Sequence, residues 1–170
     1  FVVFTSAWLN TTDVREIGRY VTDAAGTRIG SRMILSADDG QHSANLRGAF
    51  DGTNYLVVYN DGSTGTQEAA RLVSGASGGA VLPATIVTGG GSPGDSFGTA
   101  TAGTPVALPV GDGFVVAFTE PTATGENVPS ASFVDGAGSI TARSVTLSSR
   151  AALAKPGGAA VGSAFALAWK

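Results

Sequence analysis

The chain has 170 residues, a formal net charge of −3 and no cysteine. Its charged fraction of 14% is well below the roughly 25% of an average soluble domain, and its 25 glycines accompany many alanine, serine, threonine and valine residues, a composition typical of strands and turns. These values exclude a basic surface for nucleic acid, disulfides and thiolate metal sites, and no apolar run approaches the roughly 20 residues of a membrane-spanning helix.

The first part of the chain predicts three short strands. Phe1 to Ala7 is apolar, Arg15 to Thr22 alternates as a half-buried strand should, and Arg32 to Ser36 is a third strand. Trp8 to Asp13 is a polar connection, and Asp23 to Gly26 is a turn in which glycine can take a positive φ.

A loop over Ala37 to Ala44 leads to the stretch that organises the sequence. Leu46 to Phe50 precedes an Asp-Gly turn, and the apolar strand Tyr55 to Tyr59 follows with an aromatic residue at each end. A second Asp-Gly pair at Asp61 closes the stretch.

The same order of features returns twice more along the chain. The second unit has strands at Glu68 to Ser74 and Thr85 to Thr88, a turn at Gly75 to Gly78, a glycine-rich loop at Gly89 to Gly98 and a further strand at Thr104 to Leu108. The third unit has strands at Phe114 to Phe118, Ser130 to Val134 and Val145 to Ser148, with a connection at Pro121 to Asn127, a turn at Asp135 to Gly138 and a last segment at Gly157 to Ala164.

Aromatic residues mark the repeat. Phe4, Tyr59, Phe118 and Trp169 end the apolar strands, and aligning Phe4 with Tyr59 leaves the first strand without its opening aromatic residue. Nine-residue segments ending in glycine recur in step with them, at Gly18 to Gly26, Ala70 to Gly78 and Ser130 to Gly138.

A period of about 50 residues with four short strands is typical of a β-propeller blade. The sequence therefore predicts an all-β chain, 1–170, that forms one partial propeller domain of about three four-stranded blades. The units are expected at 1–54, 55–113 and 114–164, with a further unit starting at 165–170. Because propellers use roughly four to eight blades, we expect the remaining blades from a longer parent chain or from other copies of the chain.

The run Phe50 to Tyr59 resembles the "FDGTNYLVVW" blade strand of secreted and surface repeat proteins of myxobacteria and related bacteria, and Glu68 to Ser74 resembles the "IYGARVS" strand that follows it there. The resemblance implies a propeller exported to the cell surface, the extracellular space or the periplasm. It carries over no functional residue, because most members of that family have no assigned catalytic activity.

Candidate catalytic and metal-binding residues are few. His42 is the only histidine, so a Ser-His-Asp triad could be built only through it, and its polar loop favours a solvated side chain. Ser36, Asp38 and Gly40 match part of the Asp-box turn of sialidase-type propellers, which is itself a structural turn. We predict no catalytic residue, no cofactor and no enzyme activity.

Asp38, Asp39 and Gly40 could offer oxygen ligands to Ca²⁺, as could Asn60 and Asp61. Asp-Gly pairs recur five times, however, and hairpin turns are their simpler common role. None continues into a complete calcium loop, so we predict no metal site. The pairs begin at Asp39, Asp51, Asp61, Asp112 and Asp135.

Function is expected where the repeats differ from one another. We predict ligand or partner contacts at Trp8, Tyr20, Asp38, Asp39 and His42. The expected function is a non-catalytic scaffold, adhesion or interaction module. The alternative is a carbohydrate-binding propeller, or one accessory to a secreted glycosidase, in which Trp8 and Tyr20 would stack on a glycan.

Overall fold

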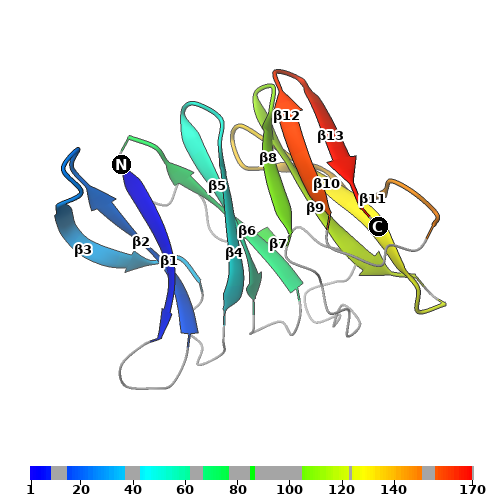
Figure 1. The fold of residues 1–170 in the computed structure, drawn as a ribbon, viewed down its shortest axis with the longest axis horizontal. Coiled ribbons are helices and arrows are strands. Elements are labelled where there is room, and N and C mark those ends of the chain that lie inside the picture. Colours follow the sequence, from blue (N-terminus) through cyan, green and yellow to red (C-terminus); the bar gives the residue numbers. More distant parts are fainter. Residues whose placement is uncertain are drawn as a thin grey trace.

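The computed structural model describes residues 1–8, 15–36, 43–61, 67–76, 85–86, 105–122, 124–150 and 156–169. The chain is all-β, as predicted, and its antiparallel strands form four small sheets that follow one another in chain order (Figure 1). Each sheet is a meander, because strands that are neighbours in the chain are also neighbours in the sheet.

The first sheet contains β1 (Val2–Trp8), β2 (Arg15–Thr22) and β3 (Arg28–Ile34). The second contains β4 (Ala44–Phe50), β5 (Asn54–Asp61), β6 (Gln67–Ser74) and β7 (Thr85–Ile86). The third contains β8 (Val106–Val110), β9 (Gly113–Pro121), β10 (Asn127–Asp135) and β11 (Ile140–Thr146), and the fourth contains β12 (Gly157–Val161) and β13 (Ala164–Ala168).

Most strands lie where the sequence predicts them, but β3 and β11 begin earlier than expected. The prediction placed them at Arg32 to Ser36 and Val145 to Ser148. In the structure the turn before β3 closes at Thr27, so pairing with β2 already starts at Arg28. The turn before β11 likewise closes at Ser139, and Leu147 and Ser148 lie beyond the strand.

Two of the predicted turns have the same hydrogen bonds. The Asp23 carboxylate accepts from Ala25 N at 2.9 Å and Thr27 N at 2.8 Å. The Asp135 carboxylate accepts from Ala137 N at 3.0 Å and Ser139 N at 2.8 Å. Gly26 and Gly138 follow with φ of 82° and 87°, a conformation that favours glycine. The turns of the first and third units therefore share individual hydrogen bonds.

The Asp-Gly pair at Asp51 is also a turn, between β4 and β5. Its carboxylate accepts from Thr53 N and Asn54 N, both at 2.7 Å, and Gly52 has a φ of 104°. Asp112 lies in the turn between β8 and β9, whereas Asp61 ends β5 and Asp39 lies outside the described residues. The turn prediction is confirmed for Asp51, Asp112 and Asp135.

Two buried clusters hold neighbouring sheets face to face. Between the second and third sheets, Leu56 and Val58 of β5 pack with Phe114, Val116 and Phe118 of β9. On the opposite face of β5, a second cluster faces the first sheet and contains Val57, Tyr59, Ile17, Leu35 and Val73. Because successive side chains of a strand point to opposite faces, β5 is apolar on both of its faces.

The third and fourth sheets are in contact as well. The rings of Phe133 and Phe165 meet edge to face, with their centroids 6.1 Å apart. Gly111 N donates to Gly162 O at 2.8 Å, which joins the turn of one sheet to the turn of the next. The stacking of each sheet on the preceding one thus continues to the fourth sheet.

The strands β4, β8 and β12 stand in a row in which each packs against the next. Small residues allow this approach: Ala49 and Ala107 belong to the cluster between the second and third sheets, and a Cβ on Gly158 would lie 3.0 Å from Leu108 Cδ1. We call β4, β8 and β12 the inner row. Each begins the meander of its sheet, whereas the first sheet begins with β1 and has no described member of the row.

The structure corrects the alignment of Phe4 with Tyr59. Tyr59 faces the first sheet and Phe118 faces the second, each toward the preceding sheet, but Phe4 packs toward the following sheet. The equivalent of Phe4 is therefore Val58, one residue earlier. Phe1 then matches Tyr55, so the opening aromatic residue is present. The predicted match of Gly18 to Gly26 with Ala70 to Gly78 is wrong by one residue as well. It aligns Arg71 with Arg19, but Arg71 pairs with Val57 as Tyr20 pairs with Val3, so the equivalent of Arg71 is Tyr20.

Candidate functional site: a groove between β1 and β4

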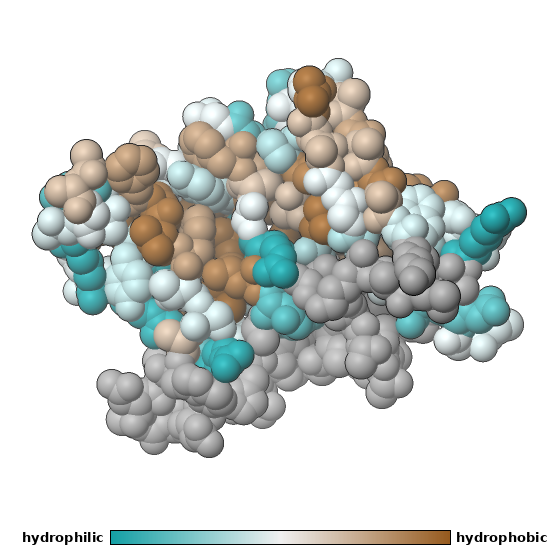
Figure 2. Space-filling view, in the orientation of Figure 1, coloured by the Kyte–Doolittle hydropathy of each residue, from teal (hydrophilic) through white to brown (hydrophobic). Residues whose placement is uncertain are grey.

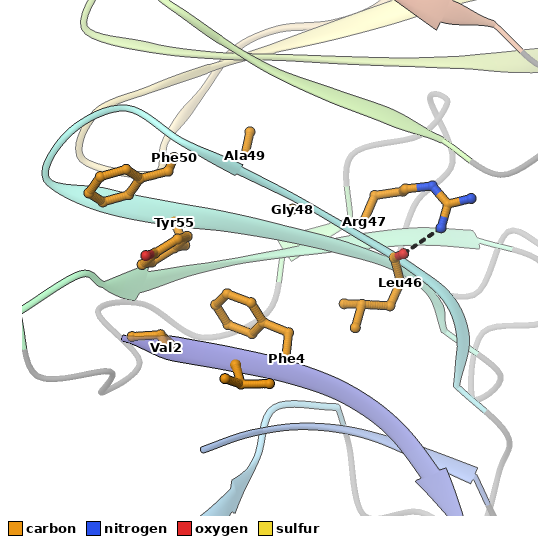
Figure 3. Close-up of a pocket in the computed structure, with 9 residues that line it drawn as sticks. Val2, Phe4, Leu46, Arg47, Gly48, Ala49, Phe50 and Tyr55 are labelled. Atoms are coloured by element: carbon orange, nitrogen blue, oxygen red, sulfur yellow. Dashed lines mark hydrogen bonds between the residues drawn. The ribbon is translucent and has the colours of Figure 1, made fainter. Parts of the chain in front are cut away.

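An open groove of about 550 Å³ separates β1 from β4 (Figure 3). Its walls are mainly apolar, and Figure 2 shows hydrophobic side chains gathered on this side of the molecule. The lining residues come from β1 and the β4–β5 hairpin: Val2, Val3, Phe4, Leu46, Arg47, Gly48, Ala49, Phe50 and Tyr55.

Three aromatic rings form one end of the groove. Tyr55 stacks on Phe50 with a centroid distance of 4.4 Å and meets Phe4 edge to face at 5.3 Å (Figure 3). Phe50 is nevertheless 44% exposed. Such packing leaves an apolar surface open beside β1.

The rest of the groove has little side-chain bulk. Among the described residues, a Cβ built on Gly48 would meet only Leu56 O, at 3.8 Å, so the β4 backbone is accessible there. Arg47 is the one charged residue of the lining, and its guanidinium donates to Leu46 O at 2.7 Å while extending away from the rings (Figure 3). The groove therefore offers an apolar and backbone surface and only one charge.

The backbone of β1 supplies the polar component of the site. Phe1 N donates to Thr22 O at 2.8 Å, and Thr22 N donates to Phe1 O at 2.9 Å. Hydrogen-bonded pairs alternate along an antiparallel ladder, so Val3 and Thr5 direct their backbone groups to β2. Val2, Phe4 and Ser6 direct theirs to the other edge, where the described part of the chain places no strand.

The outer face of the first sheet is apolar near the same edge. Phe1 is 76% exposed and Val3 42% exposed, whereas their equivalents in the third sheet, Phe114 and Val116, are buried against the second sheet. Tyr20 pairs with Val3 on this face. The positions that are exposed on the first sheet are thus the ones that pack against a neighbouring sheet in the third.

The five residues predicted as contacts are only partly described. Tyr20 is half-buried on β2, and the guanidinium of Arg28 lies 4.5 Å from its ring centroid. Trp8 ends β1, where its backbone pairs with Arg15, and its side chain is outside the described part of the structure. Asp38, Asp39 and His42 lie outside the described residues. Tyr20 and Trp8 are on paired strands. For all five residues, the predicted ligand or partner contact stays a prediction.

A buried polar network beside the groove has a structural role. Ser36 Oγ donates to the buried Glu16 carboxylate and accepts from Ile17 N at 3.1 Å. Leu35 O accepts hydrogen bonds from Tyr59 Oη, at 3.3 Å, and from Arg71. Ser36 therefore links the residues after β3 to β2, and the backbone of Leu35 links them to the second sheet.

Sequence reasoning missed the groove residues Val2, Phe4 and Leu46 because each reads as ordinary core. A correct alignment of Phe1 with Tyr55 could have identified these residues. It matches β1 with β5, which has a paired strand on each side, and so indicates that β1 lacks one partner.

Within the described ranges, His, Cys, Asp and Glu side chains nowhere gather in threes as metal ligands would. The same ranges contain no helix of the length and apolarity needed to cross a membrane. Comparison with protein-family models, curated proteins and solved structures gave no match to this chain.

Proposed function

We propose that the chain forms consecutive blades of a β-propeller that serves as a non-catalytic scaffold or interaction platform. We further propose that it works at the cell surface, in the extracellular space or in the periplasm, as the resemblance of Phe50 to Tyr59 to secreted repeat proteins implies.

The main support for the proposal is that the repeated residues have structural roles. Aromatic and aliphatic side chains at equivalent positions, such as Tyr59 and Phe118, are buried between sheets. Repeated carboxylates, such as Asp23 and Asp135, bind the backbone of turns. The repeated residues therefore stabilise the stack of sheets. This favours a structural role for them over a catalytic one.

Two further features support propeller blades in particular. Each sheet is a meander whose successor stacks on it face to face, and the inner row has glycine and alanine where its strands pack against one another. Sheets arranged around a central axis have least room for side chains there. In a complete ring, blades from a longer parent chain or from other copies would stack on the exposed face of the first sheet.

Electron microscopy of the native protein that contains this chain would test the architecture. We expect closed rings of roughly four to eight radial sheets. An open, linear stack of sheets would contradict the propeller.

The cellular role needs a separate test. Antibodies against the chain should label intact producing cells or detect the protein in the culture fluid, and material confined to the cytoplasm would contradict the proposed location. On a glycan array we expect no specific binding. A specific signal that Trp8→Ala abolishes would instead establish the carbohydrate-binding alternative.

A further inference from the structure

The open groove lies where the repeat places a strand in the other sheets. In the second sheet, β5 bonds to β4 through residues such as Leu56 and Val58, and in the third sheet β9 pairs with β8 in the same way. The equivalents of Leu56 and Val58 in β1 are Val2 and Phe4, whose backbone groups point into the groove.

From this we propose that the groove between β1 and β4 binds one extended strand of the inner-row type, which pairs with β1 and packs beside β4. The inference deepens the proposed scaffold function and rests on it, because it names what completes the first sheet. The interface would continue the inner row, in which β4 already packs against β8 and β8 against β12.

The chemistry of this strand follows from the contacts within the row. Ala49 of β4 faces the third sheet and is paired with Leu56, and Gly158 of β12 has no room for a larger side chain beside Leu108. The bound strand must therefore carry a small residue toward β4, opposite Val2. Its other face points away from the second sheet, on the side of the exposed Phe1 and Val3, where an aliphatic or aromatic residue is suitable.

The β4 segment itself is the best available probe. A capped synthetic peptide with the sequence of residues 43–52 contains Ala49, which should lie opposite Val2, and Arg47, which should lie opposite Phe4. The measurement is amide hydrogen exchange of the full, isotopically labelled chain with and without this peptide.

We expect saturating peptide to slow exchange at Phe4 and Ser6 about tenfold or more, because their N–H groups gain carbonyl partners. Val3 and Thr5 are internal controls, since their N–H groups already bond to β2. No slowing at Phe4 and Ser6 at millimolar peptide, or slowing confined to another edge, would overturn the proposal.

Two peptide variants separate edge pairing from groove binding. Ala49→Pro in the peptide removes a ladder donor and should weaken binding several-fold. Ala49→Trp keeps the donor but should also weaken binding at least tenfold, because the indole would collide with β4. Equal affinity of either variant and the parent peptide would overturn the proposed register.

Variants of the chain test the edge of β1. Ser6→Pro removes an N–H on the open edge of β1 and leaves the β1–β2 ladder intact, as proline is tolerated on edge strands. It should lower peptide affinity several-fold, while Ser6→Ala should not, and slow exchange in β5 and β9 would show that both are folded. Equal affinity of the Ser6→Pro and Ser6→Ala variants would overturn the proposal.

Two more outcomes are decisive. If Phe4 and Ser6 are already protected in the free chain and become exposed on dilution, the groove is occupied by a second copy, and the single-strand proposal is wrong. If the isolated chain fails to bind the peptide although the native protein forms rings at the cell surface, this inference alone is contradicted. Peptide binding by a chain confined to the cytoplasm would contradict only the proposed function.

Discussion

At the scale of single residues, aspartate carboxylates in the turns accept hydrogen bonds from backbone N–H groups. The Asp51 carboxylate bonds to two N–H groups in the turn between β4 and β5. Such Asx interactions hold a turn in one conformation and leave Gly52 to supply the positive φ. The local sequence Asp-Gly therefore determines where the hairpin reverses.

We expect Asp51→Ala to lower the free energy of unfolding by about 1–2 kcal/mol, because two backbone N–H groups lose their acceptor. Urea denaturation measures the change. Asp51→Asn is the matched control, since its amide oxygen can accept the same bonds, and it should be nearly neutral. An equal loss in the two variants would show that charge, and not the acceptor, stabilises the turn.

A pair of equivalent aromatic residues tests the corrected alignment. Phe114 is buried between sheets, and its equivalent Phe1 is 76% exposed. Phe114→Ala should cost about 3–5 kcal/mol of unfolding free energy. Phe1→Ala should cost under about 0.5 kcal/mol. Similar losses at both sites, measured by chemical denaturation, would contradict the exposure of the first sheet's outer face.

The sequence predicted the turn residues well and the face of each side chain less well. Asp-Gly turns have a local cause, so Asp51 and Asp135 could be identified without tertiary contacts. Phe1 to Phe4 is apolar at every position, so it lacks the alternation that assigns residues to faces. The one-residue error at Phe4 followed from that missing signal.

At the scale of strands, close backbone approach restricts some glycines and leaves others free. A Cβ on Gly113, the first residue of β9, would lie 2.3 Å from Val134 O, whereas a Cβ on Gly157 of β12 would meet no atom of the described residues within 4 Å. Both glycines begin a strand, so they form a matched pair.

Gly113→Ala should destabilise the chain by about 2 kcal/mol or more, because the β9–β10 backbone must shift to admit the methyl group. Gly157→Ala should stay within about 1 kcal/mol of the parent, since alanine also lowers the entropy of the unfolded chain. Thermal unfolding measures both changes. A tolerated Gly113→Ala would mean that β10 can move away from β9.

Composition and periodicity predicted that the strands exist, but they did not predict the irregularities within them. Asn45 and Ser144 have φ of 54° and 49°, and pairing shifts register beside each of them. These bulges depend on how a strand fits its neighbour, and no local pattern of turn residues marks them. The early start of β3 likewise reflects pairing with β2.

At the scale of the whole molecule, stability should be greatest in the centre of the stack. The second and third sheets share the larger buried cluster, while the fourth consists of two strands whose side chains are exposed or half-buried. We expect native-state hydrogen exchange to be slowest in β5 and β9 and fastest in β12 and β13. Uniform protection would indicate that the stack unfolds as a single unit.

The groove could not be predicted from the sequence, because it depends on which strand lies beside which. The apolar residues Val2 and Leu46 read as core in any all-β arrangement. Only the observed strand order shows that β1 is the edge of its sheet, whereas its equivalents β5 and β9 are interior strands.

The meander order of every sheet also bears on how the chain folds. Each strand pairs with its neighbour in sequence, so a sheet closes short loops and needs no partner from the far end of the chain. Short loops lower the entropy that must be lost when paired strands come together. During synthesis, each sheet can form soon after its own strands emerge, and the preceding sheet is already present as a surface on which the new one settles.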